Sequence, residues 1–140
     1  MSEQTTTKPT SAAPAKARRK KVKRSVPHAQ LHILATFNNT IVTFTDKSGG
    51  ALVSSSAGAC GFRGSKKSTA YAAQVAADKA AESLKQLHGT SKVDAYIRGV
   101  GLGREAVVRA MQNHDIVVET ISDVTGVAHG GCRPKKARRV

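Results

Sequence analysis

Beyond the first 29 residues, hydrophobic positions fall into three short runs that are rich in β-branched residues. The runs occupy positions 30–36, 41–46 and 51–56, and they are separated by Asn38-Asn39 and by the segment 47–50. β-branched side chains fit the pleated surface of a sheet, whereas Asn and Gly accept the backbone angles of tight turns. The pattern therefore predicts three consecutive strands joined by tight turns.

The spacing of apolar residues changes to a helical period between residues 68 and 88. The inner positions are mostly alanine and recur every three or four residues: Ala73, Ala77, Ala80, Leu84 and Leu87. Such a stripe of small side chains lets a helix lie close to a sheet. Ser65 or Ser68 is a candidate N-cap, and Gly89 is a candidate C-terminal stop. The stripe predicts a packing helix and not a cofactor site.

The rest of the pattern alternates strand, helix and strand. A strand is predicted at 92–98, a helix at 104–113 and a strand at 116–122, and the glycine-rich segment 99–103 follows the first of them. Strand, helix and strand in succession typically form a parallel pair joined by a right-handed crossover. The order βββαβαβ thus predicts a single α/β domain with a mixed five-stranded sheet covered by two helices.

Charge is concentrated at the two ends of the chain. The 140 residues include 23 Lys and Arg against 9 Asp and Glu, a formal net charge of +14. Residues 1–24 and 133–140 together hold 13 of the basic residues and one of the acidic ones, which leaves ten basic and eight acidic residues between them. We therefore expect a disordered basic arm at 1–27, a nearly neutral domain at 28–122 and a disordered basic tail at 123–140.

A polyanion is the natural partner of such a chain, either nucleic acid or an acidic membrane. No run of 18 apolar residues is present, and the N-terminus lacks the apolar stretch of a signal peptide. We expect a soluble, cytoplasmic protein without a membrane partner, and an organellar transit peptide is the alternative interpretation of the N-terminus. In the arm, we expect phosphate contacts from Arg18, Arg19, Lys20 and Lys21.

Two glycine-rich segments precede predicted helices, where backbone N–H groups and the positive end of the helix dipole favour anions. In the first segment, residues 61–67, Lys66 and Lys67 lie beside that positive end. This placement is unfavourable unless a phosphate lies between them. We favour phosphate binding over a solvated loop with surface lysines, because the charge of the whole chain indicates nucleic acid.

The second segment, GVGLGR at 99–104, resembles part of a dinucleotide fingerprint, and Asp123 follows at about the distance of a ribose-binding acid. The third glycine comes one residue early, however, and only 17 residues follow Asp123. These residues cannot build the second half of a dinucleotide-binding sheet, so we expect no nucleotide cofactor. Residues 61–69 also lack the spacing of a Walker loop.

Patterns for catalysis and metal binding are missing as well. Neither Cys60 nor Cys132 belongs to a CxxC pair, and the five histidines share no motif with them. His129 and Cys132 have the spacing of two metal ligands, but a zinc site needs about four. We therefore expect no enzyme activity, no metal site, no cofactor and no small-molecule substrate.

Aromatic residues are too few for the stacking platforms that single-strand readers use. The chain has no tryptophan, and its aromatic residues are Phe37, Phe44, Phe62, Tyr71 and Tyr96. We expect most of those in strands to lie in the core. Recognition of nucleic acid should then rest on phosphates, 2′-hydroxyls and RNA shape.

Five long motifs occur in order along residues 28–140. They are HILATFNNTIVTFTD (32–46), SAGACGFRGSKKST (56–69), AAQVAADKAAE (72–82), GLGREAVVRA (101–110) and ISDVTGVAHGGCRPKKARRV (121–140). In these motifs the chain closely resembles the family of the eleventh protein of the small ribosomal subunit, in its bacterial form.

This resemblance implies a structural constituent of the small subunit, with no catalytic residue. It implies binding to small-subunit (16S) rRNA on the platform near the messenger exit path, in support of assembly and translation. The implied neighbours are messenger RNA and the seventh, eighteenth and, where present, twenty-first proteins of the subunit. The implied location is the cytoplasmic ribosome, with a plastid or mitochondrial ribosome as the alternative.

The resemblance also implies RNA contacts from two loops and from the C-terminal tail. The implied contact residues are Arg63, Ser65, Lys66, Lys67, Ser68, Gly101, Gly103, Arg104, His129, Cys132, Arg133, Lys135, Lys136, Arg138 and Arg139. The chain departs from the family at several loop positions. The family usually has Pro at the positions of Ala70, Val100, Gly126 and Ala128, and Trp at the position of Ser54. We expect looser loops where proline is absent.

Two other functions are compatible with parts of the pattern. A free, histone-like nucleic-acid binder would also have basic tails on a small neutral body, and it would bind duplex DNA and rRNA equally at matched salt. An enzyme that uses the glycine loop would bind a nucleotide and lose it when Gly101 is changed.

Overall fold

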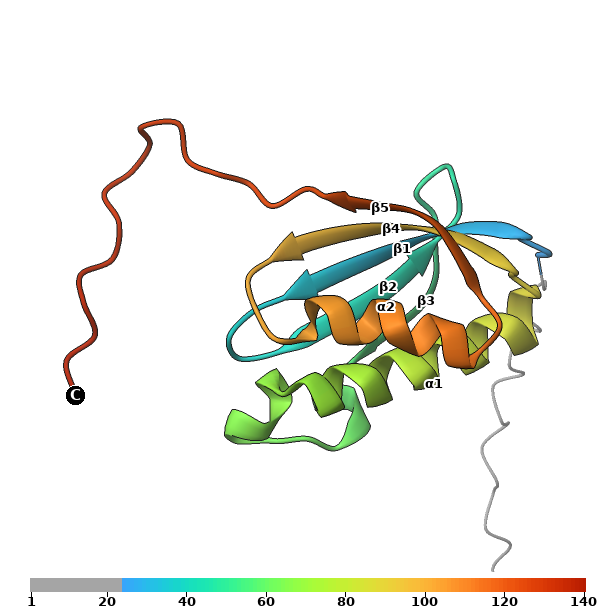
Figure 1. Cartoon of the computed structure of the whole chain (residues 1–140), viewed down its shortest axis with the longest axis horizontal. Helices are drawn as coiled ribbons and strands as arrows, with labels where there is room; N and C mark the ends of the chain where they lie inside the picture. The colour runs from blue at the N-terminus through green and yellow to red at the C-terminus, as the bar shows by residue number, and fades with distance from the viewer. Residues whose placement is uncertain (1–23) are drawn as a thin grey trace, which may run out of the picture.

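The predicted strands form one mixed sheet. The computed structural model of the protein describes residues 24–140. Its strands are β1 (His28–Ala35), β2 (Thr40–Thr45), β3 (Ala51–Ser56), β4 (Lys92–Gly99) and β5 (Val117–Asp123). They lie in the order β3-β2-β1-β4-β5 (Figure 1). Neighbours among β1, β2 and β3 are antiparallel, whereas β4 runs parallel to β1 and to β5. The predicted mixed five-stranded sheet and its parallel pair are confirmed.

Both helices lie on one face of this sheet (Figure 1). α1 (Ala70–His88) contacts β2 and β3, and α2 (Gly103–Asn113) contacts α1, β1 and β5. Two short 3-10 helices, η1 (Gly58–Cys60) and η2 (Gly64–Ser68), lead from β3 into α1. The prediction of two covering helices is therefore confirmed.

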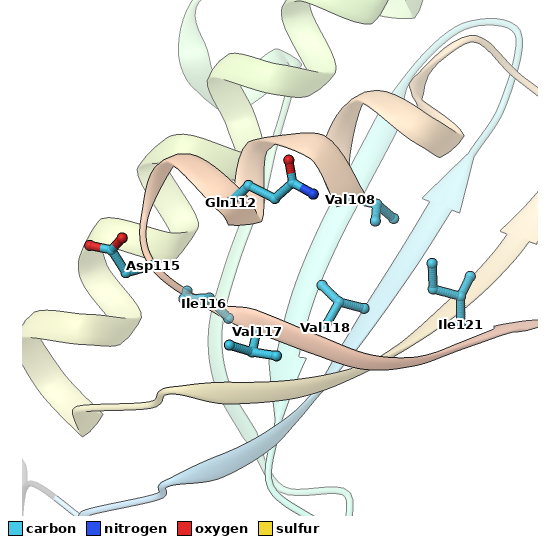
Figure 2. Close-up of a pocket in the computed structure, with 7 residues that line it drawn as sticks. All are labelled: Val108, Gln112, Asp115, Ile116, Val117, Val118 and Ile121. Atoms are coloured by element: carbon cyan, nitrogen blue, oxygen red, sulfur yellow. The ribbon is translucent and has the colours of Figure 1, made fainter.

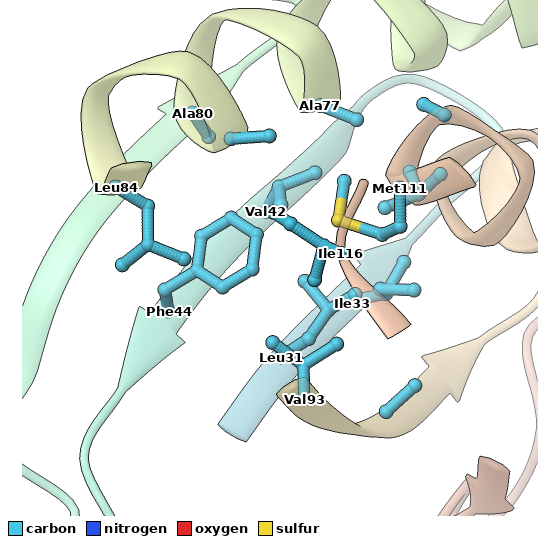
Figure 3. Packing of buried hydrophobic residues seen from close by; sticks show 14 of the residues in the cluster. Leu31, Ile33, Val42, Phe44, Ala77, Ala80, Leu84, Val93, Met111 and Ile116 are labelled. Atoms are coloured by element: carbon cyan, nitrogen blue, oxygen red, sulfur yellow. The ribbon is translucent and has the colours of Figure 1, made fainter. Parts of the chain in front are cut away.

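The core lies between the helices and the sheet. In β1, Leu31 and Ile33 are buried while the residue between them is exposed, as expected for a strand with one covered face. Figure 3 shows Leu84 of α1 beside Phe44 of β2, and both side chains are fully buried. The alanines of the α1 stripe are buried as well, so their small side chains let the helix approach the sheet closely.

Two details predicted for the first helix are wrong. Ser65 and Ser68 belong to η2, and the N-cap is Thr69, whose hydroxyl accepts a hydrogen bond from the backbone N–H of Ala72 at 3.2 Å. Leu87, expected in the buried stripe, is 43% exposed in the last turn. The predicted stop is confirmed, because Gly89 ends α1 in a left-handed conformation with φ of 62°.

The C-terminal 17 residues leave the domain. Residues 124–140 follow β5 without helix or strand and lead away from the sheet (Figure 1). Most of the predicted N-terminal arm, including Arg18, Arg19, Lys20 and Lys21, lies outside the described residues. Among the helices of residues 24–140, none is both long enough and apolar enough to cross a membrane.

Candidate nucleic-acid interface

The first predicted anion site is the connection of η1 and η2 between β3 and α1. The exposed side chain of Arg63 bridges this connection, because its guanidinium Nη1 donates a hydrogen bond to the carbonyl oxygen of Gly58 at 2.7 Å. The ring of Phe62 packs edge-on against the ring of Tyr71 in α1, with the ring centroids 5.9 Å apart. Polar and aromatic contacts thus fix the shape of this loop and anchor it to the helix.

The loop presents basic groups without acidic ones. Ser65 and Lys66 are exposed, while Lys67 and Ser68 are partly buried. Both lysines lie in the last turn of η2, and the first turn of α1 contains no acidic residue. The whole segment 47–77 holds four basic residues and no acidic residue. The loop therefore forms a patch of uncompensated positive charge next to the N-terminus of α1.

The second predicted anion site, the loop between β4 and α2, packs against the turn between β1 and β2. A Cβ atom at Gly99 would collide with the carbonyl oxygen of Ala35, and the φ of Gly99 is 89°. A Cβ atom at Gly101 would lie 2.6 Å from the carbonyl oxygen of Thr36. Both positions need glycine because backbone approaches backbone too closely for any side chain.

Gly103 begins α2 in a buried position between β2 and α1. A Cβ atom there would collide with Oγ1 of Thr40 and would lie 2.9 Å from Cβ of Ala73. Close packing inside the domain therefore accounts for the spacing of the three glycines. The RNA contacts expected at Gly101 and Gly103 stay predictions.

Arg104 links the start of α2 to the end of β5 through hydrogen bonds. Its guanidinium donates hydrogen bonds to the carbonyl oxygen of Gly99 and to the carboxylate of Asp123. Asp123 also accepts a hydrogen bond from the hydroxyl of Thr125 at 2.6 Å. The bonds from Thr125 and Arg104 lower the pKa of Asp123 to about 2, so the carboxylate is ionised at neutral pH. Asp123, spaced like a ribose-binding acid, is thus the ion-pair partner of Arg104.

The C-terminal tail starts beside this second loop. The N–H of Val124 donates to the carbonyl oxygen of Ile97 at 2.8 Å, and the N–H of Gly99 donates to Oγ1 of Thr125 at 3.2 Å. Figure 1 shows the N-termini of both helices and the start of the tail at the same end of the domain. We call this end, with Arg63, Lys66, Lys67 and the tail 124–140, the cationic end.

The predicted contact residues are thus partly gathered at one place. The η2 loop (residues 57–69), the glycine loop (residues 99–103) and the root of the tail lie at the cationic end, whereas residues 1–23 of the N-terminal arm lie outside the described residues. The tail residues expected to touch RNA are all exposed: His129, Cys132, Arg133, Lys135, Lys136, Arg138 and Arg139. Arg104 differs from them because its charge is already compensated within the domain.

A mostly apolar groove runs between α2 and the edge strand β5 (Figure 2). No sequence motif indicated this groove. Its volume is about 560 Å³, and an adjoining hollow of about 400 Å³ shares Val108 and Ile121 with it. Residues 103–123, which form α2 and β5, contain four acidic and two basic residues. This side of the domain is therefore apolar and mildly acidic, in contrast to the cationic end.

One cluster of possible metal ligands lies at the other end of the sheet. His28, Asp94 and Glu119 each offer a ligand atom, and these atoms lie within 4.8 Å of one another. His28 Nε2 is 2.8 Å from an Asp94 carboxylate oxygen, and Lys92 Nζ is 2.6 Å from a carboxylate oxygen of Glu119. These groups bind one another and join β1, β4 and β5, so the arrangement is explained as a polar network between strands.

Tyr96 lies outside the core. Most strand aromatics were expected in the core, and Phe44 lies there; Tyr96 does not, because it is partly exposed on the face opposite the helices. Its ring stacks on that of His32, with the centroids 5.3 Å apart and the planes 15° apart. The signal was present in the sequence, because Ala95 and Ile97 face the core and strand alternation turns Tyr96 outward.

Residues 29–139 match the family model described as ribosomal protein S11. The match spans all five strands except the first residue of β1, both helices, and all but the last residue of the tail.

Proposed function

Because the chain belongs to the ribosomal protein S11 family, we propose that it binds small-subunit (16S) rRNA on the platform, near the messenger exit path. Members of this family are structural proteins of the small ribosomal subunit and not enzymes, so the chain is a ribosomal protein with a structural role. Binding on the platform would support assembly of the subunit and translation.

The η2 loop at the cationic end carries this proposal. Its side-chain and backbone hydrogen bonds hold it in one shape, and Lys66 and Lys67 have no acidic residue among the 31 positions from 47 to 77. Two neighbouring cations repel each other and the positive end of a helix dipole, and an anion bound between them offsets this repulsion. A phosphate of the RNA backbone supplies that anion at a fixed position, which suits a loop of fixed shape.

The tail extends the same surface. Its five basic residues, Arg133, Lys135, Lys136, Arg138 and Arg139, follow a root that is anchored beside the glycine loop. An extended basic segment neutralises successive phosphates without reading bases. We propose that the loop sets the position of the domain on the RNA and that the tail adds affinity along the backbone.

The groove between α2 and β5 is the side that we assign to protein neighbours. Five of its seven lining residues are apolar, and the acidic residues around it would repel phosphates. β5 is also an edge strand, whose outer N–H and C=O groups are open to a partner strand. By resemblance, the candidates are the seventh, eighteenth and twenty-first proteins of the subunit.

Competition between nucleic acids tests the proposal against a free nucleic-acid binder. Full-length protein bound to a labelled platform fragment of 16S rRNA is challenged with duplex DNA or with unlabelled fragment, at one salt concentration. We expect the rRNA fragment to compete better by a factor on the order of 10³, because shape adds to charge. Equal competition by duplex DNA would leave charge alone as the basis of binding and would contradict the proposal.

A further inference from the structure

The face of the sheet opposite the helices carries two rows of outward side chains on three neighbouring strands. Strand register aligns Thr43, His32 and Tyr96 in the first row. It aligns Ile41, Leu34 and Arg98 in the second row. Together with Ile33 and Val124, the two rows line a pocket of about 270 Å³. The first row thus supplies an aromatic side, and the second supplies apolar surface and a cation.

The aromatic side of the pocket is suited to stacking. His32 and Tyr96 already stack on each other with nearly parallel rings. Partial burial, and next the charge of Arg98, lower the pKa of the largely exposed His32 below its usual value of 6.5, so the imidazole is uncharged at neutral pH. An uncharged imidazole and a phenol ring present π-surfaces that any base can stack on.

The charge at the pocket distinguishes RNA from other occupants. Arg98 is exposed, and no ion pair within residues 24–140 engages it. Of the described residues, none that lines the pocket is acidic. The volume is close to the lower end of ligand pockets, about 300 Å³, which suits one planar group better than a protein helix. A planar group joined to a negatively charged group fits the pocket, because it matches the volume, the unpaired Arg98 and the lining without acidic residues.

The pocket is also continuous with the cationic end. Leu34 and Arg98 lie one residue before the ends of β1 and β4, and Val124 begins the tail. RNA that is held at the root of the tail would therefore pass the mouth of the pocket.

We propose that this pocket receives one unpaired RNA base, which stacks against the His32–Tyr96 pair while Arg98 binds the adjoining phosphate. The inference rests on the proposed RNA-binding function and adds a base contact to an interface otherwise built from phosphate contacts. The isolated pair does not make a platform for several bases, so a single base is the occupant.

Tyrosine fluorescence gives a direct test in the full chain. The chain has two tyrosines and no tryptophan, so in a Tyr71→Phe variant the emission reports on Tyr96 alone. The probes are an oligoadenylate and an abasic ribose-phosphate oligomer of the same length, at low salt. We expect the oligoadenylate to quench the emission and the abasic oligomer to bind without quenching it.

Two substitutions separate stacking from apolar contact. Tyr96→Phe keeps an aromatic ring, whereas Tyr96→Leu keeps an apolar side chain without one. We expect Tyr96→Leu to weaken binding of the oligoadenylate about tenfold and Tyr96→Phe to leave it nearly unchanged. Binding of the abasic oligomer should be the same for both variants, because phosphate contacts do not involve this ring.

The outcomes distinguish this inference from the function on which it rests. If the protein selects 16S rRNA but neither oligomer quenches Tyr96, the pocket is not a base site and the proposed function stands. Equal affinities of the Tyr96→Leu and Tyr96→Phe variants for oligoadenylate would lead to the same conclusion. If neither the rRNA fragment nor the oligomers bind, the proposed function itself is wrong. Protection of Tyr96 only by a protein of the subunit would assign the pocket to that neighbour.

Discussion

Reversal of the two lysine charges in the η2 loop, K66E together with K67E, should weaken binding of the full-length protein to a platform fragment of 16S rRNA by a factor of about 100 or more. Each charged contact to a phosphate contributes about 1.5–3 kcal/mol, and every 1.4 kcal/mol is a factor of ten. Segment 47–77 contains no acidic residue to compensate the lysines, so both charges are available to the RNA. Filter binding at several salt concentrations measures the loss.

The matched control places the same change of charge at the other end of the domain. Lys85 and Lys92 pair with Asp115 and Glu119, and both lie away from the cationic end. K85E together with K92E should therefore weaken RNA binding only slightly, although the net charge falls equally. The loop variant should also reduce the slope of log K against log salt by about one per lost phosphate contact. Equal losses in the two double variants would show that the η2 loop is not a specific contact.

Replacement of Gly99 by alanine should lower the free energy of unfolding by about 3 kcal/mol or more. Two effects add at this position. A Cβ atom would collide with the carbonyl oxygen of Ala35, and that backbone atom cannot move aside without disturbing β1. The φ of 89° is also unfavourable for any residue except glycine. A collision in a packed region costs about 1–3 kcal/mol, and backbone strain costs a similar amount.

Two other glycines separate these effects. Gly49 has φ of 93° but open space around a Cβ atom, so Gly49→Ala should cost about 1 kcal/mol through strain alone. Gly126 has neither a positive φ nor a neighbour within 4 Å, so Gly126→Ala should stay within about 0.5 kcal/mol of the parent. Urea unfolding followed by circular dichroism gives all three values. If Gly99→Ala proved as stable as Gly126→Ala, the packing explanation of the glycine loop would be wrong.

Regular elements could be predicted from the sequence because their signals are local. Short runs rich in β-branched residues, bounded by turn residues, placed the strands to within two residues, and the alanine stripe placed α1. The N-cap was missed because Ser65, Ser68 and Thr69 carry equally suitable hydroxyls, and only the extent of η2 decides among them. The exposure of Leu87 likewise depends on where the last turn of α1 ends relative to its neighbours, which periodicity does not define.

The candidate site was less predictable because its contacts join distant segments. The glycines at 99, 101 and 103 suggested a phosphate loop. All three instead pack against residues some 60 positions earlier in the chain, and Gly103 also packs against Ala73. The sequence did not indicate that Asp123, 19 residues away, would compensate the charge of Arg104, and the RNA contact of Arg104 stays a prediction. Lys66 and Lys67 remain as predicted from the sequence, because an exposed loop without acidic residues is a local property. Their RNA contact stays a prediction.

Sedimentation of a cell lysate through a sucrose gradient at high salt tests the central claim most directly. High salt removes proteins that are held to RNA by charge alone, whereas an integral component stays in the particle. The account predicts that the protein migrates with the small ribosomal subunit. Release to the top of the gradient, or migration with DNA, would contradict a structural role in that subunit.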